Sequence, residues 1–197
     1  MKFTQLISTS NEERISNNNV IYLGHWCRTD GYIIKDELVA KYHWDNRDKL
    51  EKDYNYLINF YERILSELSK ILNQFHSKSY SVNYWRITVG YWLLYYLSVN
   101  FERWENINSV LEEFNQINFY QTLNIKHQPI PSTTREFMNL SSDVKWNHIT
   151  YTKIIKFIND KKKINIRFID KEYKNEKFYY NYRTSLKHNL KSFLIKF

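Results

Sequence analysis

The sequence is poor in the residue types on which several kinds of site depend, with one cysteine, three glycines and two prolines. A single cysteine, Cys27, excludes an internal disulfide and a multi-cysteine zinc site, and it suits a reducing compartment. Three glycines exclude a glycine-rich nucleotide loop, and neither GxGxxG, GxxxxGK(S/T) nor GxSxG occurs. The histidines lack metal-ligand spacing and there is no HExxH. The sequence therefore predicts no cofactor and no metal.

Long apolar segments are also missing. The longest uncharged apolar run, residues 87–99, falls short of the ~20 residues of a membrane span and is typical of a buried helix. Residues 1–10 lack the apolar centre and cleavage site of a secretory signal. The chain is nevertheless 43% hydrophobic and 18% aromatic, as expected of a globular protein. We predict a cytoplasmic protein, with the inner face of the membrane as an alternative location.

The order of apolar segments predicts an α/β fold. Strands are expected at residues 2–7, 20–23, 119–125 and 164–169, and the continuous apolar run at 20–23 is typical of a parallel sheet. Thr9 and Ser10, each three residues before a glutamate, resemble the capping box that begins a helix. The expected architecture is a helix-rich, mostly parallel Rossmann-like sheet with a long helical hairpin, about 45–76 and 82–106. Residues 1–169 are predicted to form a single α/β domain with this helical insertion.

The helices of the hairpin carry the strongest pattern. Apolar residues alternate every four and three positions from 50 to 75, so an amphipathic helix follows with Asp45 as its N-cap. Ser81 is expected to cap the second helix, in which Gly90 weakens the helix or allows a close contact. Ser109 and Glu112 predict a new short helix, and Asp143 begins a last helix to about 158. A dimer through the long helix is an alternative to packing in a core.

The first candidate ligand-binding residues follow strands. Ligands of open α/β sheets bind outside the carboxyl ends of the strands, which selects Thr9, Ser10, His25, Trp26 and Arg28. His25 can donate a proton, Arg28 can clamp a phosphate, and Trp26 can stack on a base or sugar. The alternative makes Trp26 a core residue and pairs Arg28 with Asp45 or Asp48. Cys27, between them, is expected to be a buried, unreactive thiol.

A second group of candidates lies at the start of the first long helix. His43, Asp45 and Arg47 there form an expected anion site, although the alternative is a purely structural helix cap. Arg86 is a further candidate. It and Arg103 stand among aromatic residues, and salt bridges to Glu102 or Glu105 are the favoured account of both.

The charge is concentrated at the C-terminal end. Residues 153–197 carry 13 basic and 4 acidic side chains, whereas residues 1–152 carry 16 and 17. The sequence predicts a basic tail or appended helix at 170–197, and apolar residues within 185–197 fall on one helical face. Peripheral membrane contact through 185–197 is one interpretation, testable by flotation. Nucleic-acid binding is the other, but no recognised motif supports specific binding.

Several segments carry a resemblance to a known family. These are YLGHWCR (22–28), YHWDNRDKLEKDYNYL (42–57), the stretch from YWRITVGYWLLYYL to NFERWENI (84–107) and WNHITYTKII (146–155). Over residues 1–158 the chain resembles the N-terminal region of a bacterial family of surface-polysaccharide transferases of O-antigen gene clusters. The resemblance implies one Rossmann-like lobe of a two-lobed glycosyltransferase, truncated relative to the family, with a nucleotide-sugar or glycan ligand. It supplies no catalytic residues.

Two functional hypotheses follow. In the first, the chain is the acceptor-side lobe of a sugar transferase and binds a phosphate- or sugar-bearing ligand. In the second, it is a non-catalytic interaction protein or remnant that docks on a missing C-terminal lobe or forms a homodimer.

Overall fold

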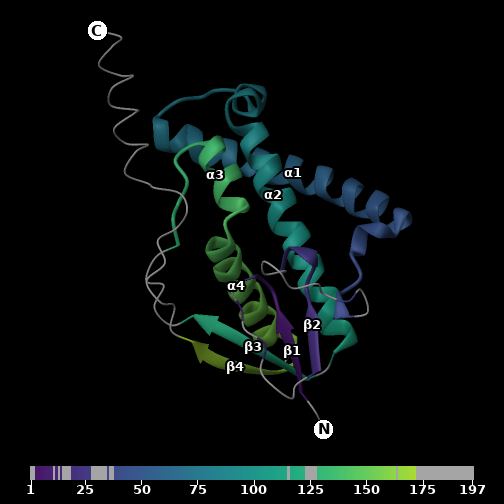
Figure 1. Ribbon diagram of the computed structural model, residues 1–197. Coiled ribbons are helices and arrows are strands. Elements are labelled where there is room, and N and C mark those ends of the chain that lie inside the picture. The colour runs from purple at the N-terminus through teal and green to yellow at the C-terminus, as the bar shows by residue number, and fades with distance from the viewer. Residues whose placement is uncertain are drawn as a thin grey trace.

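The computed structural model describes residues 3–10, 12, 14, 19–27, 35, 38–114, 116–122, 128–162 and 164–171. Its elements confirm a helix-rich α/β fold around a small sheet (Figure 1). The strands are β1 (Thr4–Ile7), β2 (Asn19–Tyr22), β3 (Gln116–Thr122) and β4 (Asn165–Lys171). They pair in parallel in the order β2-β1-β3-β4. The predictions for Arg28 and for the basic tail at 172–197 lie outside the described residues.

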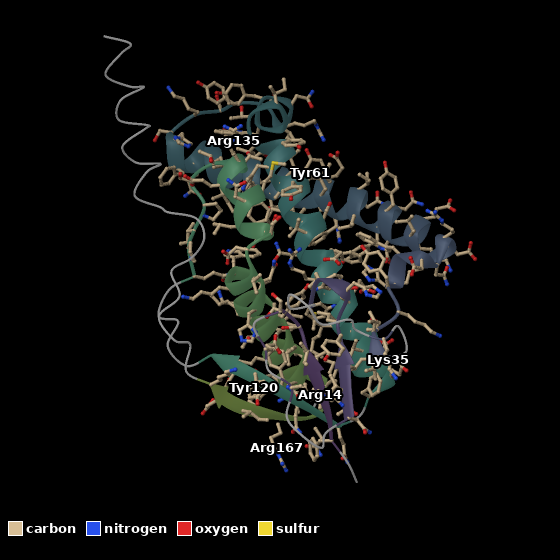
Figure 2. The ribbon with its side chains drawn as sticks, viewed as in Figure 1. Arg14, Lys35, Tyr61, Tyr120, Arg135 and Arg167 are labelled. Carbon is tan, nitrogen blue, oxygen red and sulfur yellow. The ribbon has the colours of Figure 1, made fainter. Side chains whose placement is uncertain are left out.

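The predicted helical hairpin is present, and its second helix is longer than expected. It consists of α1 (Arg47–His76) and α2 (Val82–Glu113), which extend from the sheet in Figure 1. Ser77 ends α1 in a left-handed conformation, and the Ser81 hydroxyl caps α2 as predicted. Gly90 marks a close contact, because a Cβ there would lie 2.5 Å from the Tyr61 hydroxyl. Tyr61, labelled in Figure 2, is a buried residue of α1.

Some local predictions are wrong. The N-cap of α1 is Asn46, whose side chain accepts from Lys49 N at 3.1 Å, while Asp45 belongs to the 3-10 helix η3 (His43–Asp45). No new helix begins at Ser109, because its hydroxyl donates to the Asn106 carbonyl and α2 continues. Glu12 does accept from Thr9 N at 3.0 Å, as in a capping box, but residues 12 and 14 are not helical. Strand β3 begins three residues earlier than expected.

Two further helices complete the described fold. Helix α3 (Thr134–Ser141) was not predicted, and α4 (Val144–Lys162) begins after Asp143 as expected, with the Asp143 carboxylate accepting from Trp146 N at 2.8 Å. The second half of α2 and α4 lie side by side against the sheet, and their apolar residues join β1, β2 and β3 in the main core. Among the described helices, none combines the length and apolar character needed to span a membrane.

Candidate functional site

A cavity of about 430 Å³ lies at the carboxyl edge of the sheet. After β2, the chain crosses to the other side of β1 and forms β3 there, so the order in which strands are added reverses at β1. Open α/β folds bind ligands at such a point. The end of β1, the loop after β2, the middle of α2 and the start of α4 supply the walls. Its lining residues are Thr9, Ser10, Trp26, Glu102, Arg103, Ser141, Ser142, Val144, Asn147 and Tyr151.

Trp26 forms an aromatic wall of this cavity. It belongs to the 3-10 helix η1 (His25–Cys27) directly after β2, and its indole N–H donates to the Ser8 carbonyl at 3.1 Å. That bond fixes one edge of the ring to the end of β1, yet the residue stays 46% exposed, so Trp26 is not a core residue. Gly24 makes room for the ring, because a Cβ there would lie 2.1 Å from it.

Glu102 supplies a carboxyl group to the same cavity. Its side chain is 20% exposed, and its Oε1 accepts from the Asn106 amide. Burial raises the pKa of the Glu102 carboxyl above its ordinary value, although Arg103 and the Asn106 hydrogen bond act in the opposite direction. A carboxyl with a raised pKa exchanges a proton more readily near neutral pH than an ordinary glutamate does.

Arg103 holds the cavity wall together. Its guanidinium donates to Asn147 Oδ1 at 2.8 Å, to the Val99 carbonyl at 3.0 Å and to the Ser141 carbonyl at 2.6 Å. It also lies 3.6 Å from Glu102, which confirms the predicted salt bridge. Since these bonds join α2 to the α3–α4 corner, Arg103 has a mainly structural role and only partly neutralises Glu102.

The end of β1 is fixed by a buried pair. Oε1 of Glu12 accepts hydrogen bonds from the backbone and hydroxyl groups of Ser8 and Thr9. It also lies 3.1 Å from His148 Nδ1 on α4, and the two side chains are 4% and 2% exposed. The pair ties the loop after β1 to α4 and thereby positions Thr9 and Ser10 at the cavity.

A second hollow adjoins this cavity, and a third adjoins the second. The second, of about 520 Å³, is lined by His25, Trp26, Tyr42, Asp45 and Glu102 together with Leu23, Gly24, Val39, Ala40 and Lys41. The third, of about 570 Å³, is lined by Lys41, Tyr42, His43, Asp45, Asn46, Lys49, Glu105, Asn108, Ser109 and Glu112. The loop after β2 and the N-terminal end of α1 therefore line neighbouring hollows.

The structure brings most of the predicted site residues to these hollows, but not all of them. Thr9, Ser10 and Trp26 meet in the first, and His25 and Asp45 in the second. His43 lines the third, but its imidazole is buried and turned to Asn106 Oδ1, at 2.8 Å from Nδ1. Burial lowers the pKa of His43, so the ring is neutral at pH 7.

The two remaining arginine candidates lie elsewhere. Arg47 is exposed in the first turn of α1 and lines none of these three hollows. Arg86 is on the exposed surface of the hairpin, where it forms a two-pronged salt bridge with Glu62 at 2.5 and 2.8 Å. The predicted salt bridge is therefore present, but with Glu62 of α1 instead of Glu102 or Glu105.

Sequence reasoning missed the polar residues that α2 and α4 contribute: Glu102, Asn147 and Tyr151. Nothing in the local pattern marks them, because the cavity forms only when α2 and α4 pack together. Burial raises the pKa of the Tyr151 phenol, so it keeps its proton and remains a hydrogen-bond donor.

Cys27 takes no part in chemistry here. It is 3% exposed, and its thiol donates to the Ile7 carbonyl at 3.3 Å. Burial raises the pKa of this thiol to about 12, which leaves almost no reactive thiolate at neutral pH. The prediction of a buried, unreactive thiol is confirmed. No group of three or more histidine, cysteine, aspartate or glutamate side chains suited to a metal ion occurs among the described residues.

A comparison with models of protein families gives a match. The sequence model of the LIC12162 family transferases matches residues 4–197, which is nearly the whole chain and extends past the segments quoted above. The curated proteins give no match, and neither do the solved structures.

Proposed function

Since the chain belongs to the LIC12162 transferase family, we propose that the cavity beside Trp26 binds the acceptor of a sugar transfer, with Glu102 as the general base. In such a reaction an acceptor hydroxyl attacks the activated carbon of a sugar donor. The carboxylate takes the hydroxyl proton as the new C–O bond forms and the bond to the leaving group breaks. The resemblance to surface-polysaccharide transferases supports a glycan as acceptor and a cytoplasmic site of action.

The observation that carries this proposal is the meeting of an exposed indole and a carboxyl with a raised pKa in one cavity. An aromatic face offers an apolar surface to the C–H face of a sugar, while polar groups around it bind the hydroxyls. Tyr151 supplies such a polar group from α4, whereas both ends of the Asn147 amide are hydrogen-bonded within the protein.

The charges in the cavity favour a neutral ligand over a phosphate. Arg103 uses three of its donors within the protein, and Glu102 lies beside it. The N-terminus of α4 could attract an anion, but the Asp143 carboxylate already occupies that end. Of the two ligand types expected from the sequence, the sugar hydroxyl therefore fits this cavity better than a phosphate.

Removal of the indole tests the proposal. Trp26→Ala is expected to weaken binding of neutral glycans about tenfold or more, because it removes the stacking surface while the core stays intact. Gly24→Ala should act in the same direction, since the new methyl group displaces the ring. Isothermal titration of the purified chain with mono- to tetrasaccharides of glucose, galactose and N-acetylglucosamine measures this.

The control for this titration is Arg86→Gln, a change on the hairpin surface that should leave glycan affinity unaltered. Equal affinity of the wild type and Trp26→Ala, or no affinity of the wild type for any of the sugars, would contradict the proposed function.

A second candidate, docking on a partner protein, is favoured by the apolar surface of the hairpin. Phe75, Ile87 and Tyr91 are 80%, 88% and 68% exposed, and exposed apolar surface of this kind is typical of an interface when it forms one patch. Sedimentation over a range of concentrations discriminates: self-association or binding to a partner lobe supports docking, and a monomer at all concentrations counts against a homodimer.

A further inference from the structure

The three hollows form a row beside the N-terminal end of α1, where the hairpin begins. The first and second share Trp26 and Glu102 among their lining residues, and the second and third share Lys41, Tyr42 and Asp45. An aromatic side chain therefore stands at each junction, Trp26 at one and Tyr42 at the other. Tyr42 is 37% exposed, which leaves part of its surface available to a ligand.

Hydrogen bonds connect the third hollow to Glu102. The Asn106 amide nitrogen donates to the Glu102 carboxylate, so its Oδ1 is the atom that faces His43. Because Oδ1 can only accept, the proton of the neutral imidazole must be on Nδ1 of His43. Nε2 of His43 is therefore an unprotonated hydrogen-bond acceptor.

This acceptor has no partner within the described part of the chain. His43 is 7% exposed and lines the third hollow. A buried polar atom without a hydrogen bond is costly to the fold, and such atoms in native proteins call for a specific explanation. Nε2 itself is closed to a water-sized group in this structure, so a ligand hydroxyl in the hollow would satisfy it after a small shift of the lining side chains.

The charged groups of the third hollow carry no excess of positive charge. Lys49 is held by Glu105 at 2.6 Å and by Asp53 at 3.0 Å, so it is neutralised within the protein. Asp45, Glu112 and Lys41 complete the charged lining. A neutral, hydroxyl-rich ligand suits this surface better than an anion does.

We propose that the third hollow is a second sugar subsite, where a hydroxyl of an extended, neutral oligosaccharide donates to Nε2 of His43. This inference rests on the proposed function, since the same acceptor would place its reacting end beside Glu102 in the first cavity. Tyr42 and Trp26 would contact successive sugar rings between the two ends. The acceptor class is then an oligosaccharide and not a single sugar.

His43→Asn is the sharpest test. An asparagine amide nitrogen takes the place of Nδ1 and can still donate to Asn106, but the Nε2 acceptor is lost. Wild-type affinity is expected to rise from mono- to tetrasaccharide. In His43→Asn, the affinity for the tetrasaccharide should be about fivefold to tenfold lower than in the wild type. Its affinity for monosaccharides should stay unchanged. Isothermal titration with the glucose, galactose and N-acetylglucosamine series measures both.

Controls separate this inference from the proposed function. Ile87→Ala, on the exposed face of α2, should keep the full dependence on chain length. Tyr42→Ala, at a partly exposed position, should lose the gain as His43→Asn does, and it serves if His43→Asn does not fold. If short sugars bind through Trp26 but longer ones bind no better, or His43→Asn keeps the gain, the second subsite is wrong while the first stands. If no sugar binds at all, both are wrong.

Discussion

Replacement of Glu102 by glutamine is expected to lower the rate of sugar transfer about 100-fold to 10,000-fold. Glutamine keeps the size of the side chain and can still accept from the Asn106 amide, but it cannot take a proton from the acceptor hydroxyl. Glycan affinity should therefore change little. Initial rates with a bound glycan as acceptor and a panel of nucleotide-activated sugars measure the effect.

The pH profile gives this prediction a second readout. A general base works only when deprotonated, so the rate should rise with pH through the pKa of Glu102, which burial raises above the ordinary value. The acidic limb should thus lie above the range of an ordinary glutamate, and Glu102→Gln should abolish it. The control is Glu67→Gln, on the exposed side of α1. A full rate in Glu102→Gln, or a Glu102 pKa at or below the ordinary value by ¹³C NMR, would contradict the assignment.

Arg103→Met is expected to reduce the free energy of unfolding by about 3–5 kcal/mol, the range for breaking a buried ionic contact. The change removes hydrogen bonds to Asn147, Val99 and Ser141 and leaves Glu102 without its cation. The Ser141 carbonyl keeps the Asn147 amide as a donor at 3.0 Å, so the cost arises mainly at Glu102 and at the other lost bonds. Urea unfolding followed by circular dichroism measures the difference.

The matched control is Arg63→Met on the exposed surface of α1, where the guanidinium lies over the Phe60 ring. This change should alter stability by no more than about 0.5 kcal/mol. If Arg103→Met lowers the free energy of unfolding by less than about 1 kcal/mol, other contacts hold the α3–α4 corner to α2.

The parts of the fold that sequence predicted well have strong local signals. The alternation of apolar residues along α1 and the apolar run of β2 reflect burial on one face and on both faces respectively. The ends were less predictable. Asp45 and Asn46 are equally good caps by type, and the backbone conformation that η3 imposes decides between them. For α3 a signal did exist: Thr133 and Glu136 have capping-box spacing, and Thr133 caps the helix in the structure.

The site was predictable only where strand ends define it. Thr9, Ser10 and Trp26 reach the cavity because parallel strands end at a common edge. Glu102 and Arg103 depend on the packing of α2 against α4, a contact between residues 44 positions apart in the case of Arg103 and Asn147. His43 shows a third case, because nothing in the sequence indicates that its ring turns to Asn106 and leaves Nε2 buried without a hydrogen-bond partner among the described residues.

The indole resonances of the protein provide the most direct observation of ligand binding at the cavity. The N–H of Trp26 donates to Ser8 beside the cavity, whereas that of Trp85 donates to Asn73 on the hairpin. During titration of the ¹⁵N-labelled chain with a neutral oligosaccharide, the Trp26 indole signal should shift and saturate while the Trp85 signal stays in place. A bound sugar that leaves Trp26 unmoved, or that shifts Trp85 instead, would contradict a glycan site at the carboxyl edge of the sheet.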